Sequence, residues 1–157
     1  MMNPTFTFAL LAVLGILLVW IAVVDIKTFT IADGINIAIA LMAPLFWWAS
    51  GVGLWPDAAI RVGVAIGVFV LFALMFHVGA MGGGDVKLAG ALALWFTPYE
   101  TLQMLVMMSL AGGALTIIVL AETKIRKKEG RPEVPYGVAI AFGGLWLLAQ
   151  RFLNHFA

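Results

Sequence analysis

Long apolar stretches without charge constrain the fold of this chain more than any other feature. Residues 5–24, 35–55 and 101–121 contain no charged side chain. Each stretch has about the 20 residues that an α-helix needs to cross a bilayer. Charged residues make up 11% of the chain, less than half of the roughly 25% found in soluble domains. The chain is therefore predicted to be a membrane protein and not a soluble domain.

The distribution of the apolar segments predicts six transmembrane helices in a single domain covering residues 1–157. The expected spans are 5–24, 35–55, 59–80, 85–98, 101–121 and 135–153. Helices are expected because lipid offers no hydrogen-bond partner to an open sheet edge. The first span is too long for a cleaved signal peptide, and Asp25 follows it where a small residue would be needed. The predicted fold class is an all-α, polytopic membrane protein.

The fourth expected span is unusually short. From Asp85 to Pro98 a helix would extend about 21 Å, whereas the bilayer core is about 30 Å thick. Either the bilayer thins at this point or the helix begins below the membrane surface. In the second case, water must reach Asp85 through a cleft lined by protein.

The basic residues predict the orientation of the chain. Six spans place the connections 25–34, 81–87 and 122–134 on one side of the membrane. Seven of the nine basic residues lie on that side: Lys27, Lys87, Lys124, Arg126, Lys127, Lys128 and Arg131. Because cytoplasmic loops carry an excess of Lys and Arg, this side is predicted to face the cytoplasm, with both termini outside. The basic segment is interpreted as a membrane-surface loop, so no nucleic-acid partner is expected.

Two aspartates on the predicted cytoplasmic side are candidate catalytic residues. Asp25 closes the first apolar run, and Asp85 follows three consecutive glycines. A carboxylate at membrane depth is costly and points to a function. Two neighbouring carboxylates share one proton, which provides both the base and the acid for hydrolysis of a peptide bond. The competing interpretations are that Asp85 only caps a helix and that Asp25 only ends a span.

Residues around the two aspartates are secondary candidates. Gly82, Gly83 and Gly84 would let a substrate strand approach the backbone, and Lys87 either tunes the aspartate pair or follows the cytoplasmic charge bias. Asp33 is an alternative to Asp25 as the first catalytic aspartate, but capping of the second helix is its favoured role. Elsewhere, the pairs Gly63/Gly67 and Gly112/Gly113 predict close helix contacts. The chain has no cysteine, which excludes a thiolate metal site and a cysteine nucleophile.

Gly82-x-Gly84-Asp85 is the G-x-G-D signature of intramembrane-type aspartic proteases, and residues 82–91 resemble the type IV prepilin peptidases in particular. Residues 25–33 are similar to the stretch that follows the first catalytic aspartate in that family, with Ala32 in place of a proline. Residues 134–140 resemble a third family stretch near the last span, with Val138 in place of its second proline. The resemblance extends from about residue 10 to residue 145, nearly the whole chain.

The resemblance implies a membrane-embedded aspartic endopeptidase in which Asp25 and Asp85 activate water. Its substrate would be a type IV (Flp-type) prepilin or pseudopilin, whose basic leader is removed at the cytoplasmic face of the bacterial inner membrane. Asp33 would then either cap its helix or contact that leader. No metal or organic cofactor is expected.

Larger family members carry an N-terminal cytoplasmic region with paired Cys-x-x-Cys motifs that is associated with N-methylation. This chain looks like the short, peptidase-only form without a methyltransferase region. Two other function classes stay open, a proton-coupled transporter and a non-catalytic assembly factor of a secretion system. The oligomeric state is left open as well.

Overall fold

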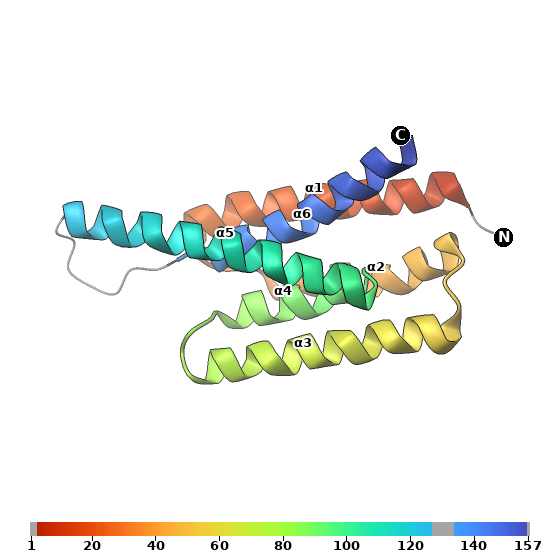
Figure 1. Ribbon diagram of the computed structural model, residues 1–157, viewed down its shortest axis with the longest axis horizontal. Helices are drawn as coiled ribbons and strands as arrows, with labels where there is room; N and C mark the ends of the chain where they lie inside the picture. The colour runs from red at the N-terminus through yellow and green to blue at the C-terminus, as the bar shows by residue number, and fades with distance from the viewer. Residues whose placement is uncertain (1–2, 127–133, 157) are drawn as a thin grey trace.

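The protein is built from α-helices that run back and forth along one axis (Figure 1). A computed structural model describes residues 3–126 and 134–156. The helices in this part are α1 (Pro4–Thr28), α2 (Asp33–Ser50), α3 (Ala59–His77), α4 (Gly83–Ala93), α5 (Pro98–Ile125) and α6 (Tyr136–Phe156). A short irregular turn, η1 (Leu54–Ala58), with Trp55 in an extended conformation, leads into α3. The predicted all-α class with six helices is confirmed.

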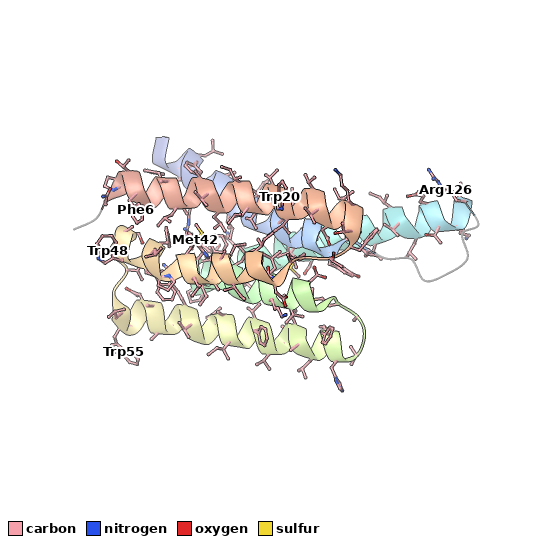
Figure 2. All side chains as sticks on the ribbon, turned by 180° about the vertical axis from the view of Figure 1, so that it is seen from behind. Phe6, Trp20, Met42, Trp48, Trp55 and Arg126 are labelled. Atoms are coloured by element: carbon pink, nitrogen blue, oxygen red, sulfur yellow. The ribbon has the colours of Figure 1, made fainter. Side chains whose placement is uncertain are left out.

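Successive helices point in opposite directions, so the bundle has two distinct ends (Figure 1). One end, here called the aspartate end, holds the end of α1 with Asp25 and the start of α4 with Asp85. The other end, here called the tryptophan end, holds Trp48 and Trp55, while Arg126 lies at the aspartate end (Figure 2). Tryptophan favours membrane interfaces, so this distribution agrees with helices that lie across a bilayer. Lys127, Lys128 and Arg131, from the predicted basic loop, lie outside the described residues.

Four segments are long and apolar enough to cross a membrane. They are Pro4–Thr28, Leu54–His77, Pro98–Ile125 and Tyr136–Asn154. Neither α2 nor α4 belongs to this group in the described chain, so six membrane crossings remain a prediction.

Two predicted helix boundaries were wrong. The second helix ends at Ser50 and not near Trp55, because Gly51 takes a left-handed conformation (φ 75°) that stops the helix. The fourth helix ends at Ala93 and not at Pro98. The N–H groups of Leu94 and Trp95 bond the carbonyls of Ala91 and Leu92 in a tightened last turn, and Thr97 then caps the start of α5. The 11-residue α4 is therefore about 16 Å long, even shorter than the sequence suggested.

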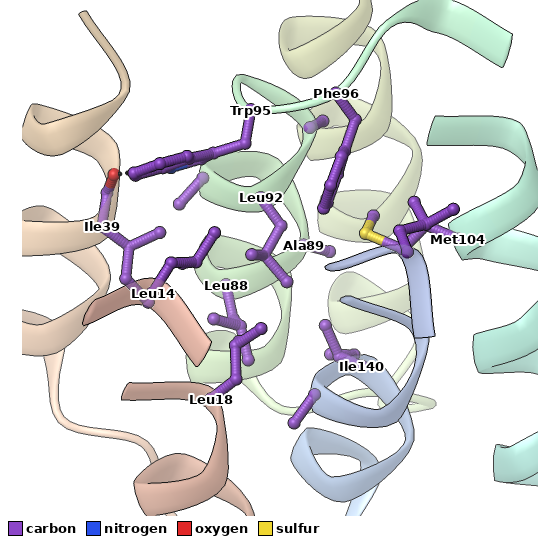
Figure 3. Close-up of a cluster of buried hydrophobic side chains, with 14 of the residues drawn as sticks. Leu14, Leu18, Ile39, Leu88, Ala89, Leu92, Trp95, Phe96, Met104 and Ile140 are labelled. Atoms are coloured by element: carbon purple, nitrogen blue, oxygen red, sulfur yellow. Dashed lines mark hydrogen bonds between the residues drawn. The ribbon is translucent and has the colours of Figure 1, made fainter. Parts of the chain in front are cut away.

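The short helix α4 forms the centre of the bundle. It packs against α2, α3 and α6, and every residue from Leu88 to Ala93 is buried. A helix that is apolar on all sides is stable only inside a protein or in lipid. Figure 3 shows the core around α4, to which the other helices contribute Leu14, Leu18, Ile39, Met104 and Ile140.

Side chains at the tryptophan end hydrogen-bond the backbone just beyond α4. Trp47 Nε1 donates to the carbonyl of Leu94 at 2.8 Å. Arg61 and Arg151 both donate to the carbonyl of Trp95, at 2.9 and 3.2 Å. We call Trp47, Arg61 and Arg151 the polar clamp. Because lipid cannot satisfy backbone carbonyls, this clamp lets α4 end inside the protein.

Glycines permit close helix contacts, at one position that the sequence suggested and at others that it did not. The predicted contact at Gly112 of α5 is confirmed, since a Cβ atom there would lie 3.6 Å from Ala139 Cβ on α6. A Cβ atom on Gly143 of α6 would lie 2.8 Å from the carbonyl oxygen of Met104 on α5. By contrast, a Cβ atom on Gly63, Gly67 or Gly113 would meet nothing within 4 Å. The predicted contacts at these three glycines were wrong, because sequence spacing alone does not tell which face of a helix meets a neighbour.

Replacing Gly143 by alanine should push α5 and α6 apart. Overpacking of this kind destabilises a protein by about 1–3 kcal/mol. Gly113→Ala is the matched control, because its Cβ enters open space and removing a helical glycine stabilises by about 0.5–1 kcal/mol. The measurement is the unfolding free energy of both variants in detergent micelles. Equal stabilities of the two variants would contradict the packing described for Gly143.

Candidate active site

The structure brings Asp25 and Asp85 to the same end of the bundle. Asp25 lies in the last turn of α1 and is 3% exposed, and Asp85 lies in the first turn of α4 and is 9% exposed. The two carboxylates are near enough for their charges to interact. Buried charges that lack a cation partner are rare in proteins. The arrangement therefore provides the paired acidic groups that acid–base chemistry requires.

Asp25 is held by the start of α6. The backbone N–H of Val138 donates to Asp25 Oδ2 at 3.2 Å. Val138 lies in the first turn of α6, where backbone N–H groups have no partner within the helix and the helix dipole favours negative charge. A Cβ atom on the neighbouring Gly137 would lie only 2.7 Å from Asp25 Oδ2. Only glycine at position 137 lets α6 approach this carboxylate so closely.

Asp85 is held by its own helix. The backbone N–H of Gly82, the N-cap residue of α4, donates to Asp85 Oδ2 at 3.3 Å. This is the side-chain half of a capping box, in which the third helical residue reaches back to the cap. Asp85 is therefore not the N-cap residue, which is Gly82, but it supports the cap from the third helical position.

The connection between α1 and α2 packs against both carboxylate-bearing regions. Phe29 ends α1 in the left-handed conformation, with φ 51°. Ile31 then lies against two glycines. A Cβ atom on Gly84 would be 3.1 Å from the Ile31 backbone oxygen, and one on Gly137 would be 2.8 Å from Ile31 Cδ1. Asn36 of α2 adds a hydrogen bond from Nδ2 to the Gly84 carbonyl at 3.1 Å. These contacts fix the starts of α4 and α6 relative to each other.

Lys87 and Asp33 pair with each other. Lys87 Nζ lies 2.7 Å from Asp33 Oδ1, and the two side chains are 48% and 62% exposed. Exposed ion pairs of this kind contribute about 0.2–1 kcal/mol. The predicted capping role of Asp33 was wrong: Ala32 is the N-cap residue of α2, and Asp33 lies in the first helical turn. Its carboxylate is taken up by Lys87 and does not join the pair formed by Asp25 and Asp85.

A cleft of about 410 Å³ opens beside Asp85. The residues that line it come from three connections, and they include Phe29, Gly79, Met81, Gly82 and Tyr136. This cleft is a route by which water can reach the carboxylate, as expected for the alternative in which the fourth helix begins below the membrane surface. Among the described residues, no group of three or more His, Asp or Glu side chains is arranged to hold a metal ion.

Three contributors to the site were not identified from the sequence. Gly137 and Val138 lie within residues 134–140, the third stretch of the family resemblance. The resemblance marked this stretch as a family feature but gave it no role in the site. Asn36 is the one amide side chain in the uncharged segment 35–55, whose other polar side chain is the hydroxyl of Ser50. A polar residue in such a segment is a usable signal, because it must find a hydrogen-bond partner when buried.

Gly137→Ala should displace Asp25 and break its hydrogen bond to Val138. We expect prepilin cleavage, the activity that the resemblance implies, to fall by about 100-fold, the scale of effect that follows a misplacement of about 1 Å. Gly34→Ala is the control, since a Cβ atom at Gly34 meets nothing within 4 Å. Both variants are assayed for cleavage and for thermal unfolding in detergent. Full activity of Gly137→Ala would show that this contact does not position Asp25.

Comparison with known proteins agrees with this geometry. Residues 12–117 match the type IV leader peptidase family. The matched range contains Asp25, Asp85 and the three glycines, and it ends before α6.

Two relatives are described as prepilin leader peptidase/N-methyltransferase, from strains 1026b and K96243 of Burkholderia pseudomallei. Each is 26% identical to this chain over 131 residues, covering 77% of this chain but only 40% of the relative. No solved structure matches the chain. Because the family match covers most of the sequence and includes both buried aspartates, the chain belongs to the type IV leader peptidase family.

Proposed function

We propose that this protein is a membrane-embedded aspartic endopeptidase that removes the leader peptide from type IV prepilins or pseudopilins of the Flp type. Asp25 and Asp85 are the proposed catalytic residues. The observation that supports the proposal best is that two buried carboxylates, from helices far apart in the sequence, have interacting charges, and that one of them, Asp85, lines a cleft.

The chemistry follows from the pairing. Two adjacent carboxylates in a low-dielectric site share one proton, because ionising both is costly. The ionised group takes a proton from water, whose oxygen attacks the scissile carbonyl carbon. The protonated group donates to the carbonyl oxygen, which gives a tetrahedral intermediate. Collapse of the intermediate breaks the C–N bond, and a proton transferred to the leaving nitrogen releases the new amino terminus.

The backbone N–H donors around the pair have a supporting role in this proposal. Gly82 and Val138 each engage one carboxylate oxygen, which orients both carboxyl groups without adding a countercharge. A lysine or arginine paired with either aspartate would instead hold that carboxylate ionised throughout the reaction. Lys87, which lies two residues after Asp85 in the sequence, is paired with Asp33 instead.

The proposed orientation has the aspartate end in the cytoplasm and all six helices within the bacterial inner membrane. Within the described residues, Lys27, Lys87, Lys124 and Arg126 belong to the segments at this end. The basic side chains at the tryptophan end, Arg61 and Arg151, bind the Trp95 carbonyl inside the protein. This distribution is the one expected from the excess of basic residues in cytoplasmic loops.

The proposal is limited to leader cleavage. The Burkholderia relatives are also named as N-methyltransferases, but this chain spans 40% of their length. Residues 1–157 contain no cysteine, whereas the region that the resemblance associates with methylation has paired Cys-x-x-Cys motifs.

A proton-coupled transporter is a weaker interpretation of the same carboxylates. A proton path across the membrane needs polar groups or water along its length. Below Asp85, the core side chains Leu88 and Leu92 are fully buried and apolar. The cleft beside Asp85 therefore leads to a site at one end and not along α4.

Replacement of either catalytic aspartate is the direct test. Asp25→Asn and Asp85→Asn should each reduce prepilin cleavage by at least about 100- to 10,000-fold, the range attributed to general acid–base groups. Asparagine keeps the size of the side chain, so both variants should still fold and insert. Cleavage is scored from the size of a Flp-type prepilin co-expressed with each variant.

Asp33→Asn is the matched control, because it removes a carboxylate from the same end of the bundle without touching the pair. It should lose only an exposed ion pair and retain measurable cleavage. Loss of all cleavage in Asp33→Asn, with activity retained in Asp25→Asn, would transfer the catalytic role from Asp25 to Asp33. Unimpaired cleavage in all three variants would leave an assembly factor as the better interpretation.

A further inference from the structure

An apolar groove runs between α2 and α3, with α4 as its floor. Its deeper part has a volume of about 350 Å³. The walls are Ile37 of α2 and Ile66 and Phe69 of α3, and the floor includes Gly90 and Ala91 of α4. Small residues on a helix allow another helix to approach closely. Gly90 already packs against α3, since a Cβ atom there would lie 3.3 Å from Phe69 Cβ, so Ala91 is the small floor residue left to contact an occupant.

The groove continues to the proposed catalytic loop. A second hollow of about 250 Å³ shares Phe69 and Lys87 with the first and extends to Phe76 and Gly83. Gly83 lies between Gly82, which lines the cleft beside Asp85, and Gly84. On α3 the lining extends from Val62 to Phe76, which is about 21 Å along the helix axis. A groove of this length matches several turns of an apolar helix.

The groove also contains a buried polar atom without a partner. Asn36 lines the groove and is 3% exposed. Its Nδ2 group donates to the Gly84 carbonyl, but its Oδ1 atom accepts no hydrogen bond within the described structure. An unsatisfied buried acceptor costs about 1–3 kcal/mol. A hydrogen-bond donor brought to this atom by an occupant of the groove would remove that cost.

We propose that this groove binds the apolar helix of the substrate, with the start of that helix beside Asn36. The inference rests on the proposed function. A leader that is cut just before an apolar segment places the scissile bond at the start of the apolar helix. The first backbone N–H groups of any helix lack a partner within the helix, so they supply the donor that Asn36 Oδ1 lacks. The groove then brings the scissile bond to the aspartate end.

Other occupants are less well matched to these observations. A lipid acyl chain fills an apolar groove but offers no donor to Asn36. A second copy of this chain offers mainly helix faces whose backbone N–H groups are already bonded within the helix. The start of an apolar helix combines a free donor with an apolar body, and both features are required here.

Cysteine cross-linking tests the proposal directly, because the chain contains no cysteine of its own. Ile37→Cys and Ile66→Cys are made in the Asp85→Asn background, which keeps the prepilin intact. Each is co-expressed with a Flp-type prepilin that carries one cysteine in its apolar segment. Ile16→Cys is the matched control: Ile16 is 69% exposed, compared with 59% for Ile66, and lines a different apolar hollow, beside Gly15 and Leu145.

We expect disulfide-linked prepilin at Ile37 and Ile66 and several-fold less at Ile16. Prepilin cysteines close to the cleavage site should link to Ile37, and cysteines further along the apolar segment to Ile66. Equal linkage at all three positions would overturn the proposal, as would linkage in the reverse order. Peptidase dimers linked through Ile66 in place of prepilin would show that a second copy occupies the groove.

A groove-filling variant gives a second readout with active enzyme. Ile66→Trp should lower kcat/KM for prepilin by about tenfold, whereas Ile16→Trp should stay within about twofold of the wild type. If Ile66→Trp cleaves normally and no prepilin links to the groove, lipid occupies it and the inference fails while the proposed function stands. If the wild type cleaves no prepilin but the groove still cross-links to it, the docking site stands and the proposed function fails.

Discussion

The structure depends on the burial of α4, a helix of 11 residues that is too short to cross a bilayer. Such a helix is stable in a membrane only if protein groups bond the backbone at both of its ends. At the tryptophan end, Trp47, Arg61 and Arg151 bind the carbonyls of Leu94 and Trp95. At the aspartate end, Asp85 and Gly82 close the first turn. The remaining helices bury α4, so its stability depends on contacts with protein and not with lipid.

The candidate site is a consequence of the same burial. The first turn of α4 carries the buried Asp85, and the start of α6 bonds Asp25 at the same end of the bundle. Ile31 packs against Gly84 and Gly137 and thereby couples the two helix starts. One side of α4 thus supports the aspartates that we propose to be catalytic. The other side forms the floor of the apolar groove that we assign to the substrate helix, so recognition and chemistry share one rigid element.

Much of this arrangement could be predicted, because lipid limits the secondary structures that a membrane-spanning segment can adopt. Uncharged stretches indicated helices, and the G-x-G-D signature marked Asp85 as a candidate. Other features could not be predicted, since they depend on which helix faces meet. Asp33 binds Lys87 and does not cap α2, and Gly143, not Gly63 or Gly67, lies at a tight contact. Helix length was also misjudged where a turn, as at Gly51, interrupts an apolar segment.

The sequence by itself determined that the protein is helical, that it belongs in a membrane and that Asp25 and Asp85 lie at the same end. Hydropathy, charge bias and the alternation of spans suffice for these conclusions. Each of these signals depends on the lipid and water around the chain and not on how the helices pack against one another. Only the tertiary structure decided which groups hold the aspartates, where α4 ends and which surface forms the groove. These features arise from contacts between residues as far apart as Asp25 and Val138, and no local pattern encodes the distance between them.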